Sequence, residues 1–185
     1  MKGSIDSRIK MMVFVAIVSI LVGGGSVRAD FTFGQPVNLG PTVNSGDYDD
    51  KPCISADGLS LYFTSNREGG YGYEDIWVST RPTTDDPWGP PENLGSVVNT
   101  ELGEFHASVS SDERELYFER WDFGPDAIPY VFDIWVSKRA ERDAPWGQPA
   151  KVELTVPDGY MAGSPSLSGD GLELYFGIYQ FGDEL

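Results

Sequence analysis

The sequence predicts an all-β fold made of four-stranded antiparallel sheets, the unit from which the blades of a β-propeller are built. Three observations lead to this prediction. A pattern of residues returns about every 55 to 58 positions, and self-similarity at such a period is typical of propellers and repeat arrays. Apolar and polar residues alternate inside the repeat, as they do in half-buried strands. The repeat also lacks the spacing of an amphipathic helix.

Four segments carry the repeat. They begin with an Asn-Leu-Gly turn, a Ser-x-Asp turn followed by an alternating strand, an Asp-Ile-Trp-Val-Ser strand and a Pro-Trp-Gly turn. In the same order, the copies lie at 38–44 and 93–99; 55–63, 110–118 and 168–176; 75–79 and 133–137; and 87–89 and 145–147. Three copies of the second segment make chance similarity a poor explanation, so fold and function are best interpreted repeat by repeat.

The first repeat unit, residues 48–99, has signals for four strands. A short apolar stretch at 52–55 ends at the turn Asp57-Gly58, and the alternating residues 59–64 complete a hairpin. A glycine-rich loop leads to a third strand at 76–80, and a proline-rich connection leads to a fourth at 92–95. Four short antiparallel strands are the composition of one propeller blade.

The remaining chain is predicted to hold one further blade, part of another, and an outer strand. Residues 105–154 repeat the unit with a longer loop at 120–132, and residues 160–185 begin a third unit. Residues 31–44 match the fourth strand of a blade and are expected to be an outer closing strand. This gives about two and a half blades, whereas propellers usually close with four to eight. We expect either a fragment of a longer protein or, if the chain is complete, a partial propeller that another chain completes by self-assembly.

The first 29 residues are predicted to be a signal peptide. Basic residues precede the apolar run 11–22, and Val27-Arg28-Ala29 offers a small-residue cleavage site before Asp30. The run is shorter than the roughly 20 apolar residues of a membrane-spanning helix. We therefore expect an exported protein, periplasmic or secreted, whose mature domain at 30–185 has no membrane span.

The net charge limits the classes of partner, and the cysteine content excludes a disulfide within the chain. The formal net charge is −16, and such a field repels phosphate backbones and anionic lipid surfaces. Nucleic acid is therefore not expected as a partner, and solubility alone also explains the charge. The single Cys53 cannot form a disulfide within the chain.

The residues of the first unit resemble a known family. The Ser-x-Asp-Gly turn, its alternating strand, Ser65-Asn66-Arg67 and Asp75-Ile76-Trp77 together look like the TolB-type, WD40-like β-propeller repeat of exported bacterial proteins. The resemblance covers nearly all of residues 31–181. It implies protein-interaction or envelope-associated modules, although propellers also accompany peptidases and glycosidases, and fold alone does not decide function. The middle copy departs from the pattern, because Asp112-Glu113 replaces Asp-Gly and Trp121-Asp122 stands near the place expected for Arg67.

The positions that recur with the repeat are expected to be mainly structural. Asp75 and Asp133 precede apolar strands and are predicted to accept backbone N–H bonds that brace a loop, with ligand contact as the alternative. Trp77 and Trp135 are predicted to pack between blades, with sugar stacking as the alternative. The turns are expected to depend on the remaining four recurring residues, Asp57, Gly58, Asp170 and Gly171.

The candidate contact residues for a ligand or partner are Asp49, Asp50, Arg67, Glu104 and His106. The acids are predicted to lie in loops before the first strands, where they are either solvated charge, partner contacts or cation ligands. His106, which aligns with Lys51 and Ser164, is predicted to lie at a polar surface position just before a first strand. It is the only histidine, so we expect neither a metal site at His106 nor a Ser-His-Asp triad. Aromatic residues in the loops before the third strands suit peptide or sugar recognition, or packing of those loops: Tyr71, Tyr73, Trp121, Phe123 and Tyr130.

These observations favour a non-catalytic module that binds a protein or a cell-envelope glycan and uses no cofactor. The alternative is a fragment of a glycosidase or peptidase whose catalytic parts lie mostly elsewhere, with the clustered acids as an acid and base pair. Catalytic residues are not assigned.

Overall fold

The structure is a computed structural model, and it describes residues 35–122 and 131–180. The elements below all lie in the compact unit Val37–Leu185. The predicted signal peptide, residues 1–29, falls outside the described residues, as does most of the loop predicted at 120–132.

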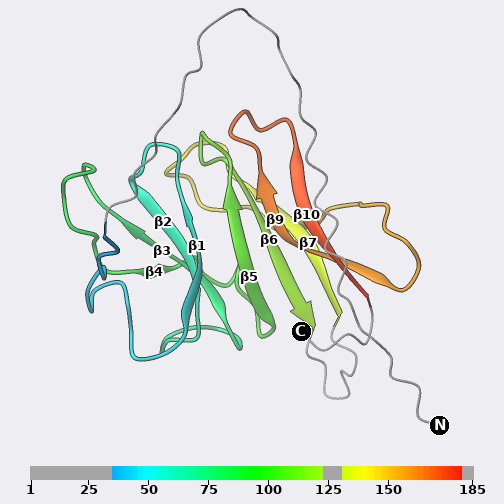
Figure 1. The fold of residues 1–185 in the computed structure, drawn as a ribbon, viewed down its shortest axis with the longest axis horizontal. Helices are drawn as coiled ribbons and strands as arrows, with labels where there is room; N and C mark the ends of the chain where they lie inside the picture. The colour runs from blue at the N-terminus through cyan, green and yellow to red at the C-terminus, as the bar shows by residue number, and fades with distance from the viewer. Residues whose placement is uncertain (1–34, 123–130, 181–185) are drawn as a thin grey trace, which may run out of the picture. The chain divides into compact units, whose positions relative to one another are not determined.

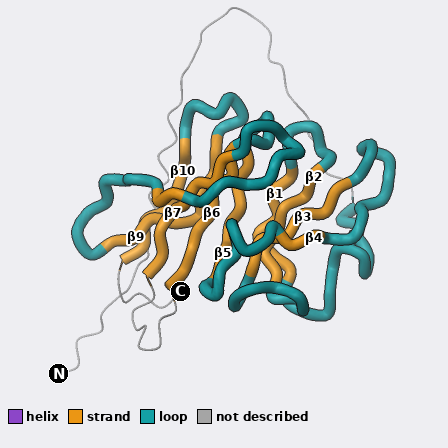
Figure 2. Tube along the Cα trace, turned by 180° about the vertical axis from the view of Figure 1, so that it is seen from behind, coloured by secondary structure: helices purple, strands orange, loops and turns teal. Residues whose placement is uncertain are grey.

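Ten strands form three antiparallel sheets (Figures 1 and 2). In each sheet the spatial order follows the order of the chain. The first sheet contains β1 (Asp49–Ile54), β2 (Ser60–Ser65), β3 (Asp75–Thr80) and β4 (Glu92–Asn93). The second contains β5 (Gly103–Val109), β6 (Glu115–Asp122), β7 (Val131–Lys138) and β8 (Ala150–Lys151), and the third contains β9 (Tyr160–Leu167) and β10 (Leu174–Gln180).

The all-β prediction is confirmed. The described residues contain no helix, and all three sheets are antiparallel, with four, four and two strands and none closed on itself. For the same reason, the described part of the chain holds no helix long and apolar enough to cross a membrane.

The Ser-x-Asp turn forms the first hairpin of each sheet. In the first sheet, Ser55 Oγ donates to Asp57 Oδ1 at 2.7 Å, and the N–H of Leu59 donates to the same oxygen at 2.9 Å. The second and third sheets repeat these contacts around Asp112 and Asp170. A side chain that accepts a backbone N–H two residues on fixes a turn locally, so these residues set the hairpins from their own sequence.

A bulge interrupts the first strand of each sheet. The register between β1 and β2 shifts between Asp50 and Cys53, and that between β5 and β6 shifts between Phe105 and Ser108. Lys51, His106 and Ser164 have left-handed φ angles of 50°, 52° and 53°. Bulges change the direction of side chains and increase strand twist. The backbone at these three aligned residues is therefore distorted in the same way.

Packing between neighbouring sheets makes the core. The first sheet contacts the second mainly through β5, and β9 of the third sheet contacts β5, β6 and β7 of the second. One buried cluster contains Tyr62 and Ile76 of the first sheet together with Leu116 and Phe118 of the second. Burial of such side chains contributes about 1.5–3 kcal/mol each, which makes contact between sheets a principal source of stability.

Two predicted placements differ from the structure. Asp49 and Asp50 lie in β1, and Glu104 and His106 lie in β5, whereas the sequence places all four in loops before these strands. The first strands begin earlier than their apolar residues, because β1 and β5 start with polar and glycine residues that pair with the ends of β2 and β6.

Candidate functional site

Asp49 and Arg67 form an ion pair inside the first sheet. Arg67 Nη2 lies 2.5 Å from Asp49 Oδ1 and also donates to the carbonyl of Val43 at 2.6 Å. Burial raises the pKa of Asp49, but hydrogen bonds from Arg67, Ser65 and Ser45 outweigh burial and hold this pKa below its usual value. Both side chains are about nine-tenths buried, so neither is offered to a partner.

Glu104 and Arg120 form the equivalent pair in the second sheet. Arg120 Nε lies 2.7 Å from Glu104 Oε1, and Arg120 Nη2 donates to the carbonyl of Val98 at 2.8 Å. Thr100 donates to the same carboxylate through its N–H and its hydroxyl. The Glu104 side chain has no exposed surface, so it is not the solvated acid that one interpretation of the sequence suggested.

The two arginines reach the same place from different backbone positions. The guanidinium of Arg67 stacks over Phe63 and Trp77, and that of Arg120 stacks over Phe118 and Trp135. Arg67 follows β2, however, whereas Arg120 lies within β6 opposite Glu104. Alignment of the repeats therefore does not pair Arg120 with Arg67. Only the strand register shows that Arg120 takes the place of Arg67 as the partner of the buried acid.

The other two candidates, Asp50 and His106, lie near one another across the first two sheets. Lys51 Nζ donates to Asp50 Oδ2 at 2.9 Å. Burial lowers the pKa of His106, Lys51 lowers it further, and Asp50 opposes both. The nearest acidic oxygen to His106 Nδ1 is Glu119 Oε2 at 3.6 Å, and Nδ1 has no hydrogen-bond partner among the described residues.

Glu119 of β6 links the second sheet to the third. Its carboxylate accepts the indole N–H of Trp121 and the backbone N–H of Ser164, the latter at 2.6 Å. Burial raises the pKa of Glu119, and these two hydrogen bonds partly offset the effect. Gly163 belongs to the same contact, because a Cβ there would collide with Glu119 and with Phe132. The sequence did not identify Glu119, whose role depends on β9.

We call the set formed by Asp50, Lys51, His106, Glu119 and Ser164 the bulge row. Its members lie on β1, β5, β6 and β9, so three sheets contribute to it. It offers an ammonium group, an imidazole, carboxylates and a hydroxyl, which can exchange hydrogen bonds with a polar ligand. Within residues 35–122 and 131–180, no three His, Cys, Asp or Glu side chains are arranged to hold a metal ion.

The recurring aspartates have different partners. Asp75 accepts the N–H groups of Tyr71 and Gly72 and the side-chain amide of Asn93, so it holds the loop before β3. Asp133 lies 2.7 Å from Lys151 Nζ. The loop that Asp133 was predicted to brace includes 123–130, outside the described residues.

Glu113 joins the first two sheets at the turn where the others carry glycine. Its φ is 53°, against 74° for Gly58 and 72° for Gly171. Glu113 Oε2 accepts the hydroxyl of Tyr62 at 2.8 Å, and Oε1 lies 2.6 Å from Arg142 Nη2. Arg142 also pairs with Asp57. Asp57 thus bonds within its turn and across sheets, and hydrogen bonds from Ser55 and Arg142 lower its pKa to about 2.

The recurring tryptophans lie among apolar neighbours and arginines. Trp77 is buried with Val43, Leu61 and Phe63, and Trp135 packs against the cluster shared by the first and second sheets. Each also lies beneath the guanidinium of Arg67 or Arg120. Trp77 is 7% exposed, so little of its ring is left for a sugar, whereas Trp135 is only partly buried.

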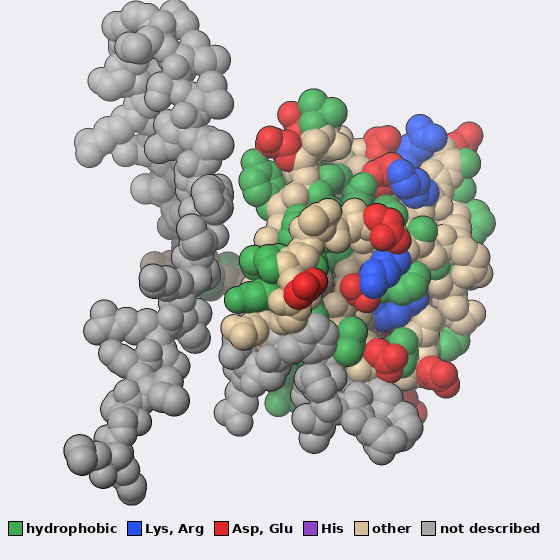
Figure 3. All heavy atoms as spheres, turned by 90° about the vertical axis from the view of Figure 1, so that its right-hand side faces the viewer, with side chains coloured by type: hydrophobic (Ala, Val, Ile, Leu, Met, Phe, Trp, Pro, Cys, Tyr) green, Lys and Arg blue, Asp and Glu red, His purple; other side chains and the backbone are tan. Residues whose placement is uncertain are grey.

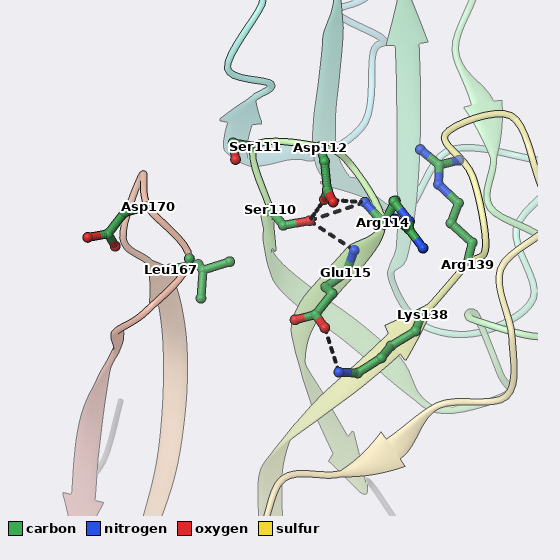
Figure 4. A pocket seen from close by; sticks show the side chains of 10 residues that line it. Ser110, Ser111, Asp112, Arg114, Glu115, Lys138, Arg139, Leu167 and Asp170 are labelled. Atoms are coloured by element: carbon green, nitrogen blue, oxygen red, sulfur yellow. Dashed lines mark hydrogen bonds and ion pairs between the residues drawn. The ribbon is translucent and has the colours of Figure 1, made fainter.

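A polar groove of about 420 Å³ lies between the turns of the second and third sheets (Figure 4). The β5–β6 turn and the end of β7 form one side, and the β9–β10 turn forms the other. Lys138 pairs with Glu115 at 2.5 Å, and Arg139 stacks on Trp146. The lining residues are Ser110, Ser111, Asp112, Arg114, Glu115, Lys138, Arg139, Leu167, Asp170 and Gly171.

Comparison with models of known families gave no match for this chain, and comparison with curated proteins gave none either.

Proposed function

We propose that this protein is an exported, non-catalytic binding module of the β-propeller type, and that its bulge row contacts a partner protein or a cell-envelope glycan. The observation that carries the proposal is the alignment of Lys51, His106 and Ser164. Three successive first strands place a polar, partly exposed residue at the same left-handed bulge. Sites on strands are held more precisely than sites on loops, which suits recognition by a rigid surface.

The propeller architecture is supported by the likeness of the sheets. The first two have the same strand order, and Phe63 and Phe118 face Trp77 and Trp135 in the same register. The third has the same Ser-x-Asp turn, and Ser164 is left-handed at the same bulge position. Successive four-stranded sheets packed face to face are the arrangement of propeller blades.

A non-catalytic role is supported by the environment of the acids. Glycoside hydrolysis by two carboxyl groups requires both to reach the substrate. Asp49 and Glu104 instead bind arginines of their own sheets and are buried. Asp50 and Glu119 remain in the bulge row, and Glu119 accepts two hydrogen bonds there.

Binding can be tested with the double variant Asp50→Asn, Lys51→Gln and the single variant His106→Gln. The matched control is Glu68→Gln with Asp143→Asn, two exposed acids on other loops. The protein would be presented to a panel of envelope glycans and, with crosslinking, to envelope proteins. We expect one ligand to bind the protein and the control alike and to bind the bulge-row variants at least about tenfold more weakly, as for residues central to a contact.

The enzymatic alternative predicts a different result from the same panel. Release of a product from a glycan or peptide, abolished by Asp49→Asn or Glu104→Gln in a chain that still folds, would support catalysis and refute the proposal. Binding that is equal in all variants would refute the bulge row as the contact surface.

A further inference from the structure

We propose that Asp158-Gly159, in the loop between β8 and β9, is a modification site at which the backbone rearranges spontaneously to isoaspartate. The rearrangement requires only water and passes through a cyclic imide. Two other Asp-Gly dipeptides occur in the chain, Asp57-Gly58 and Asp170-Gly171, and the hydrogen bonds of their turns protect them. The modification does not involve the side chains of the bulge row.

The reaction begins at the peptide nitrogen that follows the aspartate. The nitrogen of Gly159 attacks Cγ of the protonated Asp158 carboxyl group, a C–N bond forms, and the carboxyl OH leaves as water with the proton of that nitrogen. A water molecule then adds to the α-carbonyl of Asp158 and breaks its bond to the same nitrogen. The chain now runs through Cγ, the α-carboxyl group is free, and the composition is unchanged. Glycine favours the attack because no Cβ stands beside its nitrogen.

The turn at Asp158-Gly159 leaves both reacting groups accessible. The two residues are exposed, and a Cβ placed on Gly159 would meet no atom within 4 Å. The turn is closed by the N–H of Tyr160, which donates to the carbonyl of Pro157 at 3.1 Å. Within the described part of the chain, neither the Asp158 carboxylate nor the Gly159 N–H has a hydrogen-bond partner. Nothing in the turn therefore holds the carboxyl group away from the nitrogen.

The loop that carries this turn projects from the sheets. Figure 1 shows it at the right-hand edge of the sheets, where it leads into β9, and Figure 3 presents that side of the molecule. Exposed loop tips with small and polar residues are the parts of a domain most open to covalent change. Water and buffer therefore reach the reacting groups.

Exposure alone does not distinguish Asp158 from Asp170, because Asp170 and Gly171 are also exposed. Asp170 Oδ1, however, accepts the hydroxyl of Ser168 at 2.6 Å and the N–H of Leu172 at 3.1 Å. The N–H of Gly171 donates to the carbonyl of Ser168 at 2.9 Å. The carboxylate and the nitrogen are both held by the turn, so these bonds must break before the nitrogen can reach Cγ.

The turn at Asp57-Gly58 has the same protection and an additional ion pair. Asp57 Oδ1 accepts the hydroxyl of Ser55, and the N–H of Gly58 donates to the carbonyl of Ser55 at 2.9 Å. The other carboxylate oxygen of Asp57 pairs with Arg142. Attack at this site would break contacts within the turn and between sheets.

The ionisation of the two protected carboxyl groups increases the difference. Hydrogen bonds from Ser55 and Arg142 lower the pKa of Asp57 to about 2, and hydrogen bonds within its turn lower the pKa of Asp170. The attack requires a protonated carboxyl group, because its oxygen leaves as water. A lowered pKa reduces the protonated fraction at a given pH, so both protected sites react more slowly.

Isomerisation would lengthen the backbone just before the third sheet. β9 begins at Tyr160, which pairs with Gln180 of β10. Ser164 of the same strand donates its N–H to Glu119 of the second sheet. An additional methylene group at Asp158 would therefore change the path by which the chain enters the contact between the second and third sheets.

The test incubates the folded full chain in mildly acidic water enriched in ¹⁸O, because each passage through the imide introduces one solvent oxygen. Digestion in ordinary water with trypsin and chymotrypsin places the three dipeptides on separate peptides. Mass spectrometry measures the label, and chromatography against synthetic peptides identifies isoaspartate. We expect Asp158 to react at least about tenfold faster than Asp57 or Asp170, whose turn hydrogen bonds must open first. Asp158→Glu should abolish labelling at this position, since the larger imide ring forms poorly.

The chain unfolded in urea is the matched control, because it keeps the three sequences and loses the turns. There the three rates should converge. In the folded chain, Ser168→Ala should accelerate labelling at Asp170 and leave that at Asp57 unchanged. Equal rates at Asp158 and Asp170 in the folded chain would overturn the proposal. A difference that persists in urea, or labelling at Asp170 that Ser168→Ala does not accelerate, would also overturn it, because the turns would then not set the rates.

Discussion

At the scale of single residues, the buried ion pairs show how this chain tolerates charge in its sheets. Glu104 is completely buried, yet its carboxylate accepts hydrogen bonds from Arg120 and Thr100. A buried charge is costly unless it is paired and hydrogen-bonded. Loss of one partner leaves the other buried and uncompensated, so the energetic effect of mutation should far exceed that of an exposed pair.

Arg120→Met tests this expectation. We predict that it lowers the free energy of unfolding by about 3–5 kcal/mol, the cost of breaking a buried pair from one side. Lys151→Met, which removes the more exposed partner of Asp133, should cost at most about 1 kcal/mol. Urea denaturation followed by tryptophan fluorescence measures both, and equal losses would show that burial does not distinguish these pairs.

His106 should make stability depend on pH. Burial places its pKa below the usual value near 6.5, so the unfolded chain binds the proton more readily than the folded one. The contribution of His106 is therefore constant above pH 6.5 and is lost as the pH falls through 6.5 toward the folded-state pKa. The slope for one proton is at most about 1.4 kcal/mol per pH unit.

The comparison of the protein with His106→Gln isolates this effect. Glu119, whose pKa is raised by burial, acts in the opposite direction, since its ionisation above its folded-state pKa disfavours the folded chain. Urea titrations at pH 7.5, 6.5 and 5.5 should show that the unmodified protein loses stability relative to His106→Gln as the pH falls below 6.5. Parallel curves would contradict the prediction.

At the scale of elements, the first hairpin turn of the second sheet makes polar contacts with the first sheet. The three turns share Ser-x-Asp hydrogen bonds, and only the second places a charged residue in the left-handed position. A non-glycine residue in this conformation costs about 1–2 kcal/mol. At Glu113 this cost is offset by contacts with Tyr62 and Arg142. The strained residue is therefore one that bonds the two sheets together.

Glu113→Gly separates strain from contact. Glycine relieves the backbone but leaves the buried hydroxyl of Tyr62 without its acceptor, and an unsatisfied buried group costs about 1–3 kcal/mol. We expect a net destabilisation of at most about 2 kcal/mol, because the relieved strain of about 1–2 kcal/mol offsets much of a cost of about 1–3 kcal/mol. Adding Tyr62→Phe should recover part of this loss, because the phenyl ring needs no acceptor. Additive losses in the double-mutant cycle would show that the two residues are not coupled.

At the scale of the whole molecule, the acidic charge opposes compactness. The formal net charge is −16, and like charges repel more strongly in the folded chain than in the expanded one. The exposed acids experience this field, whereas Glu104 and Asp49 are neutralised in their pairs. Stability should therefore depend on ionic strength through the surface rather than through the buried pairs.

Raising NaCl from 0.01 to 0.1 M shortens the screening length from about 30 to about 10 Å. We expect the free energy of unfolding to rise by on the order of 1 kcal/mol, equivalent to about 2–4 °C in Tm for a chain of this size. Differential scanning calorimetry measures it. Glu141→Gln with Asp143→Asn should reduce the salt dependence, and a Tm that falls with salt would show that attractive pairs dominate.

The sequence predicted those parts of the fold that depend on local spacing. Alternating residues and Ser-x-Asp turns are recognisable without a structure, and the second strand of each sheet lies at the alternating residues that follow such a turn. The Arg120–Glu104 pair was missed because its members are 16 residues apart, and only the β5–β6 register brings them together. The left-handed bulges were also missed, since Lys51 and Ser164 are not residue types that mark such conformations. The bulge row requires contact between sheets, which periodicity does not specify.

Because every sheet is built from strands that follow one another in the chain, its contacts close short loops. Short-range contacts form quickly, so each sheet can assemble before it meets its neighbour. The second sheet contacts the first through β5 and the third through β5, β6 and β7, and Leu116 and Ile134 within it are almost completely buried. Its amide protons should therefore exchange most slowly. On this basis, the second sheet is the part of the chain that forms a persistent folding unit and is the last to open.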